Sequence, residues 1–237
     1  MQRTTAKKDG VITGVLFITA AVSSIIGLKL YDPVLTASDF LASGNSHYAQ
    51  VVLGAINELI LAVSATGTGI MLYSYLKKYD ERLGLGYLSF RLLEVVFIVI
   101  GTLSVLTVLS ISEIATGNNA MDSEHAKSLG VSFIALHKWT FIMGPNFMLA
   151  VNTFIYSYTF YRVRVIPPHL ARFGMVAACF IMLAAILELF GIIAQISIWG
   201  ILLALPIALY EMTLAIYLIK YGFRLPAEKD IQKSKMQ

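Results

Sequence analysis

Six apolar runs, each long enough to cross a lipid bilayer as a helix, leave this chain few folds to adopt. A helix of about 20 mainly apolar residues spans the hydrocarbon core. The runs cover about residues 10–30, 49–76, 85–112, 131–161, 171–196 and 198–221. In lipid the backbone must satisfy its own hydrogen bonds, which a helix does within one segment. The sequence therefore predicts an all-α integral membrane bundle of six transmembrane helices in a single domain, residues 1–237.

Composition agrees with a membrane protein. Of the 237 residues, 57% are hydrophobic and 14% are charged, whereas a soluble domain is about a quarter charged. The single cysteine, Cys179, lies within an apolar run. One cysteine excludes a disulfide within the chain and a thiolate metal site. The sequence contains no nucleic-acid-binding motif, so the expected partner is the lipid bilayer, with a small molecule or a lipid as a further ligand. Cofactor and oligomeric state stay open.

The basic residues predict the orientation of the spans. Fourteen of the 18 Lys and Arg residues fall in the two ends of the chain and in the second and fourth connections, and two fall in the remaining connections. Cytoplasmic segments carry the excess of Lys and Arg. Both termini are therefore expected to be cytoplasmic, which requires an even number of spans.

The connections between the runs carry further signals. The fourth run is too long for a straight span, and Pro145 predicts a kink in it. Only a tight turn fits between the last two runs, which predicts a helical hairpin. The loop at residues 31–48 is expected to hold a short interfacial helix capped by Thr36 or Ser38. The charged tail at 225–237 is expected to be disordered.

Five charged residues lie inside the apolar runs: Glu58, Arg91, Glu94, Glu188 and Glu211. Ionisable groups at membrane depth are costly, and they face a protein interior or a water cavity. Each carboxylate shares a helical stripe with small residues, which let membrane helices approach closely. We therefore expect the acids to point into a shared interior. Glu58 and Glu188 should lie in the outer half of the membrane, and the other three nearer the middle or the inner half.

Charge counting adds a constraint on this interior. Four acids face one guanidinium, which leaves three surplus negative charges if all the acids ionise. Uncompensated carboxylates in a dry interior take up a proton, share one, or hold a bound cation. Glu188 is expected to be the most isolated of the four. The spacing of Arg91 and Glu94 allows an ion pair on one helix, either as a structural salt bridge or as a clamp for an anion or lipid headgroup.

Three uncharged polar residues complete the candidate ligand-binding set. Asn57 is expected to form a hydrogen bond between helices beside Glu58. His137, followed by Lys138 and Trp139, is either part of an interfacial anchor or a metal or proton site with a nearby carboxylate. Because no metal-ligand spacing accompanies it, no metal site is predicted. Asn146 follows Pro145 in an irregular stretch of the kind that forms transporter sites.

Several segments resemble bacterial membrane proteins grouped as domain of unknown function 4386. They are Gly54–Leu59, Leu83–Leu88 with Arg91–Glu94, Tyr161–Pro167, and Tyr210–Met212 leading to Lys220–Phe223. The resemblance runs from the first span to about Arg224. A family Pro-Arg pair after the fourth span reads Pro167-Pro168-His169 here. The resemblance implies a multi-pass protein of the bacterial cytoplasmic membrane, and it implies no activity.

These observations favour one function and leave two others open. The leading expectation is that a central polar pocket binds, or moves, a small cationic or protonatable solute. The first alternative is an intramembrane enzyme that acts on a lipid or isoprenoid-like substrate through an acid–base pair. The second is a non-catalytic assembly subunit in which the buried charges serve helix packing. Whether the protein is an enzyme stays undecided at this point.

Overall fold

The computed structural model describes residues 2–116 and 122–224 of the chain, and the predicted disordered tail lies outside these ranges. Within them every regular element is helical, which confirms the all-α prediction. The elements are α1 (Gln2–Leu30), α2 (Asp32–Leu35), α3 (Phe40–Ser46), α4 (Tyr48–Leu76), α5 (Glu81–Thr116), α6 (Ser123–Phe141), the π-helix η1 (Ile142–Met148), α7 (Leu149–Val163), α8 (Pro168–Leu189) and α9 (Ile198–Tyr221).

Five helices of the described chain are long and apolar enough to cross a membrane: α1, α4, α5, α8 and α9. The predicted fourth run corresponds to α6, η1 and α7, which follow one another without a break. A π-helix holding Pro145 stands where the sequence predicts a kink. The proline ring removes one N–H from the helical ladder, and the wider turn accommodates the defect.

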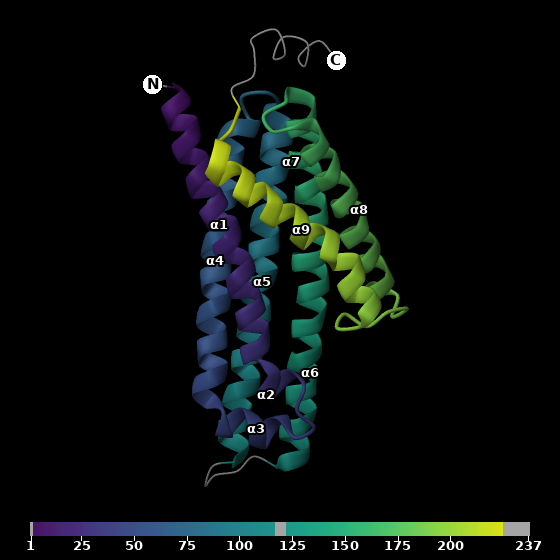
Figure 1. Ribbon diagram of the computed structural model, residues 1–237. Helices are drawn as coiled ribbons and strands as arrows, with labels where there is room; N and C mark the ends of the chain where they lie inside the picture. The colour runs from purple at the N-terminus through teal and green to yellow at the C-terminus, as the bar shows by residue number, and fades with distance from the viewer. Residues whose placement is uncertain (1, 117–121, 225–237) are drawn as a thin grey trace.

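The long helices form a closed ring around a common interior. Along the chain, α1 packs on α4, α4 on α5, α5 on α6, η1 and α7, and α7 on α8; α8 then packs on α9, and α9 returns to α1 (Figure 1). The described chain therefore begins and ends at the same end of the ring, which we call the terminal end. The opposite end, where α2 and α3 lie, is the distal end.

Two glycines of α1 close the ring. A Cβ on Gly10 would lie 2.6 Å from the Cα of Gly222, and a Cβ on Gly14 would lie 2.6 Å from the carbonyl oxygen of Ala215. The two backbones are therefore nearly in contact where α1 crosses α9. Small residues spaced four apart permit this approach between membrane helices.

A set of aromatic side chains fills the interior toward the terminal end. Tyr87, Tyr156, Phe160 and Tyr210 are fully buried. The ring centroids of Tyr156 lie 5.7 Å from Tyr87 and 6.0 Å from Tyr210, so side chains from α5, α7 and α9 meet here. Leu, Ile and Val side chains cover the outward faces of the ring.

The fifth predicted run ends earlier than expected. The prediction extended it to residue 196, whereas α8 ends at Leu189. Gly191 adopts a left-handed φ of 68°, its N–H donates to the carbonyl of Glu188, and the N–H of Ile192 donates to that of Leu187. This pair of bonds is a Schellman cap, which ends a helix inside an apolar sequence. The sixth predicted run corresponds to α9, which begins and ends at the predicted residues 198 and 221.

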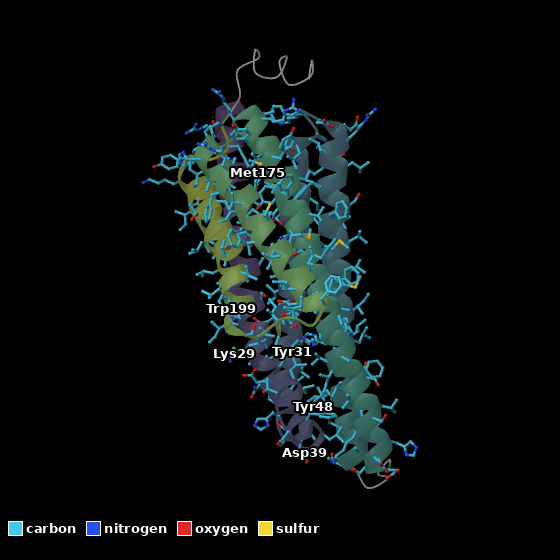
Figure 2. All side chains as sticks on the ribbon, turned by 90° about the vertical axis from the view of Figure 1, so that its right-hand side faces the viewer. Lys29, Tyr31, Asp39, Tyr48, Met175 and Trp199 are labelled. Atoms are coloured by element: carbon cyan, nitrogen blue, oxygen red, sulfur yellow. The ribbon has the colours of Figure 1, made fainter. Side chains whose placement is uncertain are left out.

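The distal end extends beyond the hairpin of α8 and α9. Trp199 at the hairpin lies at a height similar to that of Lys29, and Asp39 lies well beyond both (Figure 2). The expected cap of the short helix is wrong: the side chain of Asp39, and not Thr36 or Ser38, accepts a hydrogen bond from the N–H of Ala42. An Asp carboxylate at the N-cap also complements the helix dipole.

Candidate functional site

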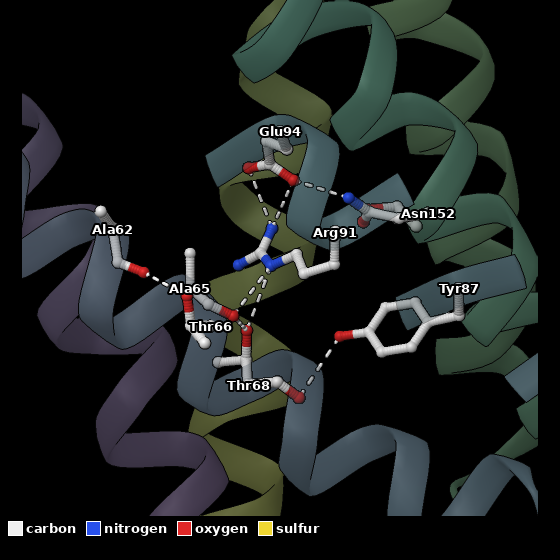
Figure 3. A network of polar contacts seen from close by, with 9 residues as sticks. Ala62, Ala65, Thr66, Thr68, Tyr87, Arg91, Glu94 and Asn152 are labelled. Atoms are coloured by element: carbon white, nitrogen blue, oxygen red, sulfur yellow. Dashed lines mark hydrogen bonds and ion pairs between the residues drawn. The ribbon is translucent and has the colours of Figure 1, made fainter. Parts of the chain in front are cut away.

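An ion pair between Arg91 and Glu94 lies at the centre of the interior (Figure 3). Nη1 of Arg91 is 3.0 Å from Oε1 and 2.8 Å from Oε2 of Glu94. Each residue is 4% exposed, so water reaches neither to any extent. One turn of α5 separates them, which is the spacing that permits contact along a helix. The pair is thus internal to α5, and the surrounding helices supply its remaining partners.

Helix α4 holds the guanidinium in place. Nε of Arg91 donates to the carbonyl oxygen of Ala65 and to Oγ1 of Thr68, both at 3.2 Å. The hydroxyl of Tyr87 donates to the Thr68 carbonyl at 3.3 Å. Gly69 makes room for this approach, since a Cβ there would lie 3.3 Å from Cγ of Arg91. Arg91 is therefore bound at two of its nitrogens: Nε by groups of α4, and Nη1 by Glu94 of its own helix.

The segment formed by α6, η1 and α7 holds the carboxylate. Nδ2 of Asn152, on α7, donates to Oε2 of Glu94 at 2.6 Å. Glu94 therefore accepts hydrogen bonds from Arg91 on its own helix and from Asn152 on α7. Because Arg91 is also bound to α4, the ion pair links α4, α5 and α7. Removing one partner of a buried pair of this kind leaves an uncompensated charge, which costs about 3–5 kcal/mol.

Glu211 brings a second carboxylate from α9 to the same region. It interacts electrostatically with both Arg91 and Glu94. Its Oε1 is buried, and no group in the described part of the chain forms a hydrogen bond with it. The Arg91 charge is already matched by Glu94. An ionised Glu211 therefore adds one negative charge that the described residues leave uncompensated.

Glu188 was expected to be isolated, and that expectation is wrong. Nδ2 of Asn146 donates to its Oε2 at 2.8 Å, and both residues are buried. Asn146 belongs to η1, where Gly144 packs against α5: a Cβ on Gly144 would lie 3.2 Å from the carbonyl oxygen of Glu94. Among the described residues, Glu211 is instead an acid with a buried oxygen, Oε1, that has no hydrogen-bond partner.

Asn146 and Asn152 place two acid sites along one helical segment. Six residues separate them, or about 9 Å of α-helical rise. Asn146 binds Glu188 and Asn152 binds Glu94. Between them, η1 gives way to α7. A change in the turn of η1 therefore shifts the two amides relative to each other, and with them the two carboxylates that they bind.

Glu58 is separate from this arrangement. It lies on α4 beside α1, where a Cβ on Gly27 would lie 2.5 Å from its Oε1, and it interacts electrostatically with Tyr31. The expected bond of Asn57 to another helix is wrong, because its amide donates to the carbonyl of Leu53 one turn back on α4 at 2.9 Å. Seven residues, about 10 Å of rise, separate Glu58 from Ala65 beside Arg91.

His137 does not join a carboxylate through its Nδ1. That nitrogen lies 3.2 Å from the carbonyl oxygen of Gly101, and the ring meets Tyr31 edge-on at 5.9 Å. In residues 2–116 and 122–224, no group of three His, Cys, Asp or Glu side chains is arranged to hold a metal ion. The structure thus places His137 against α5 and the end of α1, on a different level from Arg91.

Two contributors were not among the predicted site residues: Thr68 and Asn152. Each binds one member of the ion pair. The signal available for Asn152 was a lone amide within an apolar run, on the helical segment that also contains Asn146. Thr68 gave no such signal, because Thr is common in membrane helices, where its hydroxyl donates a hydrogen bond to a backbone carbonyl of the same helix.

Comparison with known proteins supports the resemblance seen in the sequence. Among curated proteins and among solved structures, nothing matches this chain. One family model does match, and its match extends from α1 to the glycine after α9, so that it includes Arg91 and the four acids of the apolar runs. The chain belongs to the family described as Domain of unknown function (DUF4386), over residues 12–222.

Proposed function

We propose that this protein spans the bacterial cytoplasmic membrane six times and that it binds and moves a small cationic or protonatable solute through its interior. The segment α6–η1–α7 serves as the fourth span, and the terminal end of the ring faces the cytoplasm. The support is that the described chain begins and ends at one end of the ring, and that most of the Lys and Arg residues belong to segments at that end, as cytoplasmic segments do.

The observation that carries the functional proposal is the unpartnered carboxylate oxygen of Glu211. A buried acceptor without a partner costs about 1–3 kcal/mol, and more if it is charged. A proton, or a cation with N–H groups, removes that cost. The neighbouring Arg91 forms its ion pair with Glu94 and is bound by Ala65 and Thr68, so it interacts with Glu211 electrostatically and without a hydrogen bond. Glu211 is therefore a group in the interior that gains from a bound cation.

The route through the membrane is supported by the second acid site. Glu188 and Glu94 are bound by amides on either side of the transition from η1 to α7. Single π-helical turns often occur at functional sites, and broken helices form the binding sites of many transporters. In this proposal, η1 changes its turn as the solute passes, and each carboxylate exchanges its amide partner for the solute.

The test is electrical recording on the full-length protein reconstituted in liposomes on a solid support. Guanidinium, methylammonium and choline serve as the probes. We expect at least one probe to give a saturable current in the native protein. Glu211→Gln should reduce that current by at least tenfold, since the amide keeps the shape of the side chain and removes the negative charge.

The matched control is Glu113→Gln, which makes the same change in an exposed carboxylate near the distal end of α5. Its current should equal that of the native protein. Native currents in both Glu211→Gln and Glu94→Gln would contradict the proposal, because no interior charge would then contribute to movement.

One observation favours the alternative of an enzyme acting on a lipid. An apolar groove of about 390 Å³ runs between α7 and α8, and its lining includes Ala150, Phe154 and Ile186. Ala150 is one turn from Asn146, and Ile186 is two residues from Glu188, so an acyl chain in the groove ends close to a buried acid. Two results together would favour this alternative. The native protein would release a product from a supplied lipid while Glu188→Gln would not, and no cation probe would give a current.

A further inference from the structure

A cleft of about 1040 Å³ opens at the terminal end of the ring, apart from the buried acids. Its lining residues come from three segments distant in sequence: the first turns of α1, the start of α8 and the end of α9. All three segments lie at the terminal end of the ring (Figure 1). Its basic lining residues are Lys7, His169 and Arg224. Among the described lining residues there is no acid, so the electrostatic potential in the cleft favours an anion.

The walls of the cleft are fixed by the backbone. The N–H of Phe223 donates to the carbonyl of Ala6 at 3.3 Å, and the N–H of Arg224 donates to that of Val165 at 2.9 Å. The segment that follows Gly222 is thus bound on one side to α1 and on the other to the turn before α8. Stacking of Phe223 on Tyr75, with ring centroids 4.0 Å apart, anchors the same segment to α4. The basic side chains therefore project from a preformed frame.

The guanidinium of Arg224 is oriented for a ligand. Its Nε donates to the hydroxyl of Tyr217 at 3.0 Å. Its two terminal nitrogens form no hydrogen bond with the described residues, and the side chain is exposed. A guanidinium with its terminal fork free binds a phosphate through two parallel hydrogen bonds. Lys7 also lines the cleft, and its ammonium donates to the carbonyl of Lys220.

The start of α8 adds to the attraction. Pro168 has no N–H, and the N–H of Ala171 is already bonded to the carbonyl of Pro167. The N–H groups of His169 and Leu170 are the unsatisfied donors of the first turn, and His169 lines the cleft. Such donors, together with the helix dipole, bind anions. Tyr217 and Tyr221 form an aromatic side to the cleft, with ring centroids 5.2 Å apart.

We infer that this cleft binds a phosphate-bearing anion between Arg224, Lys7 and the start of α8. The phosphate belongs either to an anionic phospholipid headgroup or to a free phosphate in solution. The inference does not depend on the proposed movement of cations, because none of the interior acids lines the cleft.

The test uses the full-length protein in a zwitterionic detergent with two probes. Inorganic phosphate is titrated by calorimetry, and retention of phosphatidylglycerol against phosphatidylcholine is measured by native mass spectrometry. We expect at least one probe to bind with one equivalent per chain, and phosphatidylglycerol to be retained over phosphatidylcholine if the headgroup is the source. Binding of phosphate with no such preference identifies free phosphate as the source. Arg224→Gln and Lys7→Gln should each weaken binding by about tenfold, as the loss of one charge-assisted hydrogen bond does.

The matched controls are Arg82→Gln and Lys8→Gln. Each removes the same charge from an exposed position at the same end of the ring and outside the cleft lining. Binding should be unchanged in both, and all four variants should unfold at the native temperature, because the substituted side chains are exposed. The inference is overturned if neither probe binds, or if the controls weaken binding as much as the cleft variants do.

Discussion

The amide of Asn152 lies 2.6 Å from Oε2 of Glu94, across the interface between α7 and α5. This single contact joins the interrupted fourth segment to the ion pair that also holds α4. Asn152 therefore links α7 to α5 directly and to α4 through the ion pair. Its consequences can be measured without knowledge of any substrate.

Replacing Asn152 with Ala should destabilise the protein by about 1–3 kcal/mol, because the buried carboxylate of Glu94 loses one of its donors and keeps only Arg91. Thermal unfolding in detergent is the measurement. Asn57→Ala is the matched control, since the amide of Asn57 serves only its own helix. If both variants unfold at the same temperature, the contact between α5 and α7 contributes nothing.

Arg91→Leu should be strongly destabilising, by about 3–5 kcal/mol, because Glu94 is left buried and uncompensated. The double variant Arg91→Leu with Glu94→Leu should recover most of that loss, since neither charge is then buried. A double-mutant cycle of unfolding free energies provides the measurement. Additive losses would show that the two side chains act independently, in conflict with their distance of 2.8 Å.

Gly10→Ala should destabilise the crossing of α1 and α9, although Ala is ordinarily the better helix former. The added methyl group would lie 2.6 Å from a backbone atom of Gly222, which cannot rotate away. The control is Gly86→Ala, where the nearest atom is a side-chain methyl at 3.9 Å. There the substitution should stabilise by up to about 1 kcal/mol. Opposite signs in thermal unfolding are expected, and equal signs would contradict the close approach.

Gly191 tests the early end of α8. Its φ of 68° is left-handed, and a Cβ there would meet nothing within 4 Å, so the cost of substitution is purely conformational. Gly191→Ala should cost about 1–2 kcal/mol, and Gly191→Asn should cost less, because Asn tolerates this region. Unfolding temperatures that rank Gly above Asn and Asn above Ala are expected. An Ala variant as stable as the native protein would mean that the helix continues past Leu189.

The sequence predicted the helices well, because length and hydropathy are local properties that the bilayer imposes. It also placed Arg91 and Glu94 on one face, since both lie on one helix. It failed where a contact depends on which helices are neighbours. Asn57 and Asn152 are both amides in apolar runs, yet one bonds to its own backbone and the other to a distant carboxylate. Which helices are neighbours in the ring decides that difference, and the sequence of one apolar run does not contain this information.

The Schellman cap at Gly191 could not be read from hydropathy, because the residues after it are as apolar as those before it. For the same reason Glu188 seemed isolated: its partner, Asn146, comes from the π-helical turn of another segment. In both cases the deciding information is backbone geometry and not composition.

The early end of α8 has a consequence for how the protein should be handled. The hairpin exposes Phe190 at 78%, Ile198 at 77% and Trp199 at 67%, and the first half of α9 rests on few neighbours. Because these side chains are apolar, they need acyl chains around them to keep their surface out of water. Bound lipid therefore completes the packing around the hairpin, and a harsh detergent that removes this lipid should destabilise the hairpin first.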